Sequence, residues 1–466
     1  MPARPLPSSA AEQIAAANPL RLAEGALQRV LCLSGTQPVD VDHYLREVNG
    51  LAQLLAEQAP EADHLLNLCE NRYRFLVLFG AALALGLPSL LPPSRAANVV
   101  GEMLQRYPRA LAVGDDQFPG GVSLQQRPER YVSLPNPLPQ GAALQPPLSA
   151  GQLAVIGFTS GSSGPPKPQY KTWGDFCLST AHNLLLIQSV AGSEPQALAT
   201  VPPQHMYGME TSVLMPLRGE LCIHESRPFF PADIAATLSS LPAPRVLITT
   251  PVHLRSLLDS ELLLPPLSLI LSATAPLPQS LAERAEQRTG ASVLELFGST
   301  ETCVIAHRRT ALEQDWQPYP DVQLEADVDG TWVRAPWLPQ PVLLQDRMAL
   351  SDDGRFQLAG RCSDHLEIAG KRASLGEINQ RLLALPGVTD AVVFVPEPGA
   401  QVARVAALVV APDRSEAELL SELRASLDPV FLPRPLRLVS QLPRNETGKL
   451  PREALLAALK WGGTAR

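Results

Sequence analysis

The chain has 466 residues, too many for one ordinary hydrophobic core, so at least two domains are expected. Its composition, 45% hydrophobic and 18% charged, excludes a disordered chain, and its net charge of −8 argues against a general nucleic-acid binder. The six cysteines lie far apart without a Cys-x-x-Cys pair, which fits a reducing cytoplasm and neither a disulfide framework nor a zinc site.

The N-terminal part is expected to be helical, because apolar residues recur at helical spacing in residues 10–17 and 44–58. The first ten residues lack the apolar stretch of a secretory signal. Residues 75–91 are the most apolar stretch, but they are fewer than the about 20 residues of a membrane span and are interrupted by glycine and proline. We expect a buried helix followed by a short strand, and a soluble protein without stable membrane insertion.

From residue 153 onward, short apolar runs that read as buried strands alternate with amphipathic segments that read as helices. The strands are expected at 153–158, 197–201, 245–249, 267–271 and 292–296, and the helices at 176–187, 234–241 and 279–288. This alternation predicts a large layered α/β domain with mostly parallel sheets. Ligands in such sheets bind where loops leave the carboxyl ends of strands, and the loops at Thr159 and Gly298 are expected there.

The loop after the strand at 153–158 has the residue types of an anion site. Gly161 and Gly164 allow the backbone to turn sharply and to approach a ligand. Short hydroxyl groups and one lysine accompany these glycines: Thr159, Ser160, Ser162, Ser163 and Lys167. Backbone amides with such side chains form a concavity suited to phosphate. The same composition also occurs in plain surface loops, and no Gly-Lys-Ser/Thr closes a P-loop here.

A second strand-end segment combines a ring, a hydroxyl group and a carboxylate. Phe297 offers a flat face, Thr300 a hydroxyl group and Glu301 a hard oxygen ligand for Mg²⁺. A solvated loop carboxylate is the common alternative for Glu301. The presence of a separate phosphate loop shifts the balance towards a nucleotide and metal site.

Two stretches further along add an acid with an arginine, and a lysine. Asp346 and Arg361 lie on either side of Asp353-Gly354, a dipeptide typical of hairpin turns. A carboxylate there can accept hydrogen bonds from ribose hydroxyl groups. Near the C-terminus a tight turn presents Lys449, although exposure is the usual fate of a lysine.

The last hundred residues change character. Short strand-like runs at 391–395, 405–410 and 436–439 are interleaved with two or three short helices, which predicts a small α+β domain. We predict a large domain over residues 1–360 and a small one over 361–466, joined near residues 360–364.

The four stretches at residues 159–167, 297–302, 346–361 and 443–452 occur in a characteristic order and spacing. Together they resemble the adenylate-forming (AMP-binding) superfamily of acyl- and aryl-CoA synthetases, nonribosomal adenylation domains and luciferases. The resemblance covers roughly residues 61–452. It implies ATP-dependent activation of a small carboxylic acid to an acyl-AMP with release of pyrophosphate. Transfer to a phosphopantetheine thiol, of CoA or of an acyl carrier protein, then follows. The implied cofactors are ATP and Mg²⁺, and the small domain carrying the catalytic lysine is implied to move between the two steps.

The resemblance also assigns roles to matching positions. Thr159 to Gly164 with Lys167 would be the phosphate loop, Phe297 with Gly298 would flank the adenine, and Thr300 would touch the α-phosphate. Glu301 would hold Mg²⁺.

The remaining roles concern the acid, the ribose and the transferred group. His205 matches an aromatic or histidine gate of the acyl pocket, although a lone histidine is more often structural. The loop with Ala273, Thr274 and Ala275 would border the adenine and the acyl group. The ribose would be bound by Asp346 and Arg361, and the substrate carboxylate and phosphate would be bridged by Lys449.

Three departures from the family pattern indicate a divergent branch. Leu344-Gln345 replaces the usual Thr-Gly before Asp346, and Pro168 replaces the glycine after Lys167. Ser363 replaces the usual hinge aspartate, and Asp364 lies one residue later. None of them removes a principal catalytic group.

Residues 272–277, 297–302 and 368–372 resemble the compact synthetases of bacterial aryl polyene and xanthomonadin-type pigment clusters. This likeness implies a hydroxybenzoate- or hydroxycinnamate-like acid. A fatty acyl acid, a non-catalytic module that binds ATP or an acyl adenylate, and transfer to a hydroxyl group or amine stay open.

Overall fold

The computed structural model describes residues 20–92, 95–115, 131–159, 167–361, 365–368, 371–396, 404–424, 427–445 and 450–461. The chain divides into two compact units. Unit 1 comprises Met1–Gln314, Pro318–Val322 and Ala335–Gln340, and unit 2 comprises Asp315–Gln317, Gln323–Arg334 and Pro341–Arg466. The predicted boundary between a large domain (residues 1–360) and a small domain (residues 361–466) stays a prediction. The helix predicted at residues 10–17 lies outside the described residues.

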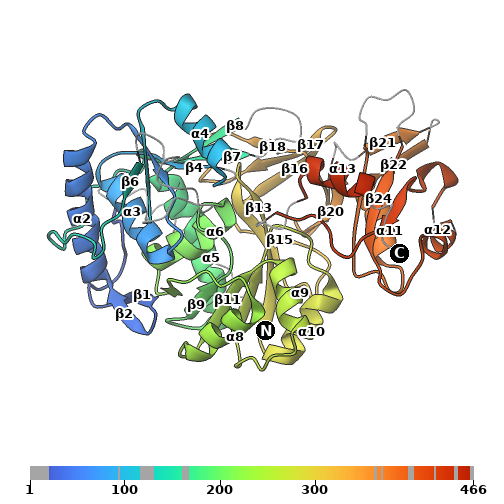
Figure 1. The fold of residues 1–466 in the computed structure, drawn as a ribbon, viewed down its shortest axis with the longest axis horizontal. Coiled ribbons are helices and arrows are strands. Elements are labelled where there is room, and N and C mark those ends of the chain that lie inside the picture. The colour runs from blue at the N-terminus through green and yellow to red at the C-terminus, as the bar shows by residue number, and fades with distance from the viewer. Residues whose placement is uncertain are drawn as a thin grey trace. The chain divides into compact units, whose positions relative to one another are not determined.

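Unit 1 contains a sheet with strand order β6-β5-β3-β4-β7-β8. Its strands are β3 (His64–Asn67), β4 (Ser89–Leu91), β5 (Ala110–Gly114), β6 (Tyr131–Ser133), β7 (Leu153–Thr159) and β8 (Lys167–Thr172). All neighbours in it are parallel except β7 and β8. The predicted buried helix is confirmed as α3 (Arg72–Ala84), and the predicted short strand is confirmed as β4. Helix α3 packs against α2 (Val41–Gln58), and α4 (Ala97–Arg106) follows β4 in the chain (Figure 1).

A second sheet of unit 1 runs in the order β14-β13-β12-β11-β9-β10-β1-β2. Its strands are β1 (Val30–Ser34), β2 (Gln37–Asp40), β9 (Gln196–Ala199), β10 (Cys222–His224), β11 (Arg245–Thr249), β12 (Leu269–Ser272), β13 (Ser292–Ser299) and β14 (Cys303–Arg308). Neighbouring strands from β1 to β13 in this order pair in the parallel sense. Strand β2 pairs with β1, and β14 pairs with β13, in the antiparallel sense. The mostly parallel α/β architecture is thus confirmed.

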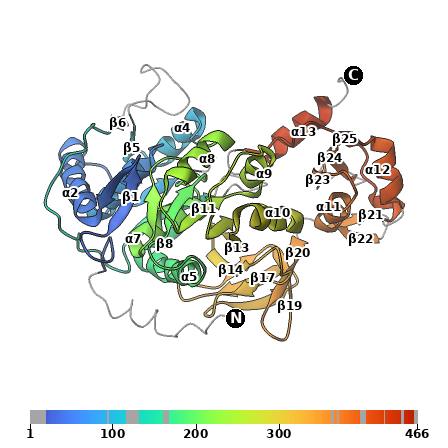
Figure 2. The ribbon, with the colours of Figure 1, turned by 90° about the horizontal axis from the view of Figure 1, so that it is seen from below.

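Helices cover this second sheet and build its core. Buried aliphatic side chains of α8 (Pro231–Ser240), α9 (Pro251–Asp259) and α10 (Gln279–Thr289) pack with those of β9, β11, β12 and β13. The three helices lie side by side in both views (Figures 1 and 2). The other helical segments are α5 (Trp173–Ala191), α6 (Met206–Met209), η2 (Glu210–Leu214) and α7 (Met215–Arg218). Such burial of apolar surface is the main source of stability here.

Strand β13 extends well beyond its predicted end. We predict a strand at 292–296 with a loop at Gly298, but β13 continues to Ser299, so Phe297 and Gly298 lie within it. The reason is the antiparallel partner β14, which continues the hydrogen-bonded ladder past a bulge between Phe297 and Gly298. The loop is therefore shorter and begins two residues later than predicted.

Unit 2 is built from small antiparallel sheets and an α+β layer. Its strands are β16 (Gln323–Asp327), β17 (Gly330–Arg334), β18 (Val342–Leu344), β19 (Asp346–Leu350), β20 (Phe356–Arg361), β21 (His365–Ile368), β22 (Lys371–Ser374), β23 (Asp390–Phe394), β24 (Ala406–Val410) and β25 (Leu436–Leu438). The helices described there are α11 (Leu375–Leu383), α12 (Glu416–Leu423), η4 (Pro429–Phe431) and α13 (Arg452–Trp461). β15 (Gln317–Pro318) marks the passage of the chain back to unit 1.

The predicted small α+β region is confirmed. The runs at 391–395, 405–410 and 436–439 correspond to β23, β24 and β25, whose inward residues share one core with α11 and α12. Within the described ranges, no helix has both the length and the apolarity needed to cross a membrane.

Candidate active site

The phosphate loop predicted from the sequence connects two antiparallel strands. Strand β7 ends at Thr159 and β8 begins at Lys167, and these two residues are register partners. Lys167 is exposed. The predicted phosphate-binding residues between the two strands lie outside the described residues: Ser160, Gly161, Ser162, Ser163 and Gly164. The side chain of Thr159 also lies outside them. The ladder therefore fixes where this loop leaves and re-enters the sheet.

Gly157, two residues before the end of β7, marks a meeting point of three segments. A Cβ atom at this position would lie 3.0 Å from Cγ2 of Thr300 and 3.4 Å from Cε of Met206. Thr300 belongs to the turn after β13, and Met206 follows His205 at the start of α6. The strand leading to the phosphate loop, the Thr300 turn and the His205 segment are therefore in contact within unit 1.

The turn that carries Thr300 and Glu301 is held by its own hydroxyl groups. The amide of Ser299 donates to Oγ1 of Thr302 at 3.2 Å, and the amide of Thr302 donates to Oγ of Ser299 at 3.2 Å. Cys303 closes the turn with a φ of 61°, which a non-glycine residue rarely adopts. The backbone conformation of the turn is thus constrained locally.

Three buried side chains from elsewhere in unit 1 hold the backbone of the same turn. Nζ of Lys171 donates to the carbonyl oxygen of Glu301 at 2.5 Å, and Nε1 of Trp337 donates to that of Thr302 at 2.7 Å. The amide of Val304 donates to the carboxylate of Glu210, at 3.1 and 3.2 Å from its two oxygens. None of Lys171, Trp337 and Glu210 is among the site residues predicted from the sequence, because no local motif announces a contact between such distant segments.

Burial also alters the acidity of Glu210. Loss of water around this carboxyl group raises its pKa to about 7, and the hydrogen bond from Val304 and the charge of Lys171 oppose that rise only in part.

The carboxylate of Glu301 suits a magnesium ion. It is half-buried, and it has no hydrogen bond or ion pair to another described residue. Mg²⁺ usually takes one or two protein carboxylates and completes its shell with water and phosphate oxygens. Among the described residues, no cluster of three or more His, Cys, Asp or Glu side chains could hold a metal ion.

The His205 segment is fixed to the end of strand β12. His205 is half-buried, and its carbonyl oxygen accepts the amide of Met209 at 2.7 Å as α6 begins. The hydroxyl group of Tyr207 donates to the carbonyl oxygen of Leu271 at 3.0 Å. This bond joins the His205 segment to the strand from which the predicted adenine loop emerges.

In that loop, Ala273 is buried, Ala275 is half-buried and Thr274 is exposed with a φ of 80°. At the end of β13, Phe297 is half-buried and Gly298 is exposed. These five residues therefore lie at the ends of the neighbouring strands β12 and β13, and their contacts with a nucleotide stay predicted.

Unit 2 brings two predicted ribose residues together. Asp346 begins β19, Arg361 ends β20, and the two are register partners across the hairpin. The predicted turn at Asp353-Gly354 connects these strands, with Gly354 at a φ of 81°. The side chain of Arg361 lies outside the described residues, as do Lys449, Ser363 and Asp364.

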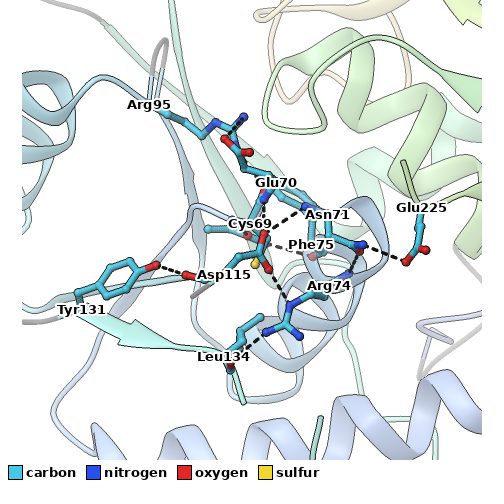
Figure 3. Close-up of polar contacts among 11 residues, drawn as sticks. Cys69, Glu70, Asn71, Arg74, Phe75, Arg95, Asp115, Tyr131, Leu134 and Glu225 are labelled. Atoms are coloured by element: carbon cyan, nitrogen blue, oxygen red, sulfur yellow. Dashed lines mark hydrogen bonds and ion pairs between the residues drawn. The ribbon is translucent and has the colours of Figure 1, made fainter. Parts of the chain in front are cut away.

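A polar cluster fixes the edge of the first sheet that carries the phosphate loop (Figure 3). Asp115, directly after β5, accepts the amides of Glu70 at 2.7 Å and Asn71 at 3.2 Å, and Nε of Arg74 at 2.6 Å. Asn71 also donates to Glu225, beyond β10 of the second sheet, at 2.9 Å. Since β5, β3, β4 and β7 are parallel, this cluster lies on the same edge as Thr159 and ties the two sheets together there.

Comparison with known proteins identifies the family of the chain. The model of the family described as "AMP-binding enzyme" matches residues 28–325, and that of its C-terminal domain matches residues 377–449. A 4-coumarate–CoA ligase of Halorhodospira halophila is 29% identical over 300 residues, which cover 63% of this chain and 73% of that protein.

Two solved structures have the same fold over nearly their whole length. ATP-bound MatB from Rhodopseudomonas palustris superposes with a TM-score of 0.79 at 19% identity, covering 97% of this chain and 99% of that one. The o-succinylbenzoate CoA synthetase of Bacillus subtilis, in complex with its acyl-adenylate intermediate, superposes with a TM-score of 0.78 at 18% identity and 98% coverage of both chains. The chain belongs to the family of AMP-binding enzymes and is an AMP-forming acid–thiol ligase.

Proposed function

We propose that this ligase activates an aromatic carboxylic acid of the hydroxybenzoate or hydroxycinnamate type. The acid and ATP would form an acyl-AMP with release of pyrophosphate, and the acyl group would pass to the phosphopantetheine thiol of CoA or of an acyl carrier protein. The observation that carries the adenylation step is the contact of β7, the Thr300 turn and the His205 segment around Gly157. The similar 4-coumarate–CoA ligase and the pigment-cluster motifs support an aromatic acid.

The residues of unit 1 would bind the nucleotide. The loop between Thr159 and Lys167 would hold the β- and γ-phosphates, and Thr300 would donate to the α-phosphate. Phe297 and the loop after β12 would enclose the adenine. Glu301 would hold Mg²⁺, which when bound offsets the negative charge of the phosphates.

Other residues would bind the ribose and the acid. Asp346 and Arg361 would bind the ribose hydroxyl groups from neighbouring positions on the hairpin. His205 would close the acyl pocket. Both reactants are anions, so Lys449 would bring the carboxylate to the α-phosphorus and stabilise the charge that concentrates in the transition state.

Transfer to the thiol would require the small domain to move, with the hinge near residues 361–364. Rotation would take Lys449 away from the adenylate and admit the phosphopantetheine arm. The cytoplasmic location predicted from the cysteine usage stays a prediction.

ATP–pyrophosphate exchange against benzoates, hydroxycinnamates and fatty acids tests the proposal. Exchange with one aromatic class and not with fatty acids is the expected result, and thioester analysis with CoA and a carrier protein then identifies the acceptor. Exchange only with fatty acids would refute the aromatic assignment. Failure of every acid would favour the non-catalytic binding module.

A further inference from the structure

Two ionisable side chains are buried in unit 1 close to the Thr300 turn. Lys171 is 3% exposed and Glu210 is 1% exposed. Burial of a charge is strongly unfavourable unless hydrogen bonds and an opposite charge compensate it. The partners of these two side chains therefore indicate what they contribute.

Both side chains direct polar atoms to the backbone of the turn that follows β13. Lys171 donates to the carbonyl oxygen of Glu301, and Glu210 accepts the amide of Val304. These bonds bracket the turn, since one acts at the predicted metal ligand and the other three residues later. A buried carbonyl or amide left without a partner would be costly, so the two side chains fix the turn in one position.

The elements that supply the two side chains are themselves well fixed. Lys171 lies on β8 opposite Val155 of β7, four residues after Lys167, so both lysines face the same side of the strand. Strand β8 therefore runs from the end of the phosphate loop directly to the support of the Thr300 turn.

Glu210 opens the π-helical segment η2, a type of helix that often occurs at functional sites. Behind it, Nδ2 of Asn183 donates to its Oε2 at 3.4 Å, and the hydroxyl group of Tyr319 donates to Oδ1 of Asn183 at 2.6 Å. A buried chain of hydrogen bonds thus extends from Tyr319 to the amide of Val304.

We infer that Lys171 and Glu210 are positioning residues of the adenylation reaction, which set Thr300 and Glu301 relative to the phosphate loop. This inference rests on the proposed function, in which the carboxylate of Glu301 holds Mg²⁺. The effect of the two side chains passes through two backbone groups of the turn, and removing them should weaken the magnesium-dependent part of nucleotide binding.

Calorimetric titration of the full chain with α,β-methylene-ATP, in Mg²⁺ and in EDTA, tests this inference. Lys171→Met and Glu210→Leu remove the donor and the acceptor, and we expect each to weaken binding in Mg²⁺ by about tenfold or more. Binding in EDTA should weaken less than binding in Mg²⁺, because the phosphate loop is untouched and only the contact of Thr300 with the α-phosphate is affected. A merely stabilising role would not change the ratio of the two affinities.

Conservative variants and an outside control complete the test. Lys171→Arg keeps a donor and Glu210→Gln keeps an acceptor oxygen, so both should retain most of the magnesium-dependent binding. Lys460→Met removes an exposed lysine of α13 and should leave both affinities unchanged. Hydrogen exchange of residues 297–305 without nucleotide should become faster in Lys171→Met and stay unchanged in Lys460→Met.

If a single variant fails to fold, the double variant Lys171→Met/Glu210→Leu replaces it, since it leaves no unpaired buried charge. A folded double variant with the wild-type ratio of affinities in Mg²⁺ and EDTA would overturn the inference while leaving the proposed function intact. A wild-type chain that does not bind the analogue at all would overturn both.

Discussion

Replacing Gly298 by alanine would put a methyl group where the backbone of β14 already lies. The added Cβ would be 2.2 Å from the carbonyl oxygen of Cys303 and 2.7 Å from Cα of Val304. Carbon–oxygen contacts in proteins are about 3.3 Å or longer, so the two strands would have to separate by about 1 Å. Because both obstructing atoms are backbone atoms, no side-chain rotation can relieve the clash.

The displacement gives the expected magnitudes. Insertion of one carbon into a packed region costs about 1–3 kcal/mol, and we expect the upper end because Cys303 already has an unfavourable φ of 61°. The same displacement moves Thr300 and Glu301, which follow Gly298 by two and three residues. Misplacement of reacting groups by about 1 Å can lower a rate by about 100-fold, and we expect a loss of this size in ATP–pyrophosphate exchange.

Gly101→Ala is the matched control, since it makes the same chemical change in helix α4 with no atom within 4 Å of the new Cβ. Alanine is preferred to glycine in helices, so the control should gain about 1 kcal/mol and keep full exchange. Urea denaturation and pyrophosphate exchange measure the two effects. A Gly298→Ala protein within about 0.5 kcal/mol of wild type and fully active would refute the reasoning.

Three further substitutions test individual side chains. Lys449→Ala should lower pyrophosphate exchange by about 100-fold or more yet still convert a synthetic acyl adenylate to thioester, and normal exchange would remove Lys449 from the adenylation step. Glu301→Gln should raise the Mg²⁺ concentration for half-maximal exchange by about tenfold, whereas an unaltered dependence would argue against metal binding. Because burial raises the pKa of Glu210 from 4.5 to about 7, the folded chain keeps a proton there that the unfolded chain releases. Wild-type stability relative to Glu210→Gln should therefore fall by about 3 kcal/mol as the pH rises through this interval, and urea denaturation that gives a constant difference would contradict the shift.

The sheet architecture was predictable because parallel strands covered on both faces have continuous apolar runs. Strand β11 shows this most clearly, since the predicted range 245–249 has the bounds of the observed strand. The Thr159 loop, residues 273–275 and the Thr300 turn were likewise expected after strands, and they follow β7, β12 and β13; their roles at a nucleotide stay predictions. Positions along the chain were sufficient for both inferences.

Contacts between distant segments were not predictable in this way. The extension of β13 through Gly298 depends on β14, whose pairing across a bulge no local pattern announces. The Asp115 cluster joins the loops after β3, β5 and β10, which meet only in the folded protein. Both cases need the position of one chain segment relative to another.

The buried charges show why such supporting residues escape a sequence analysis. Lysine and glutamate are usually exposed, so Lys171 reads as an ordinary surface residue of a short strand. The sequence does indicate that Glu210 is unusual, because it is the one charged residue in the otherwise uncharged stretch 206–217. A charge within an apolar run is tolerated only if another segment supplies its partner, and here that partner is the amide of Val304. The requirement can be read from the sequence, but only the fold identifies the Thr300 turn as the segment that meets it.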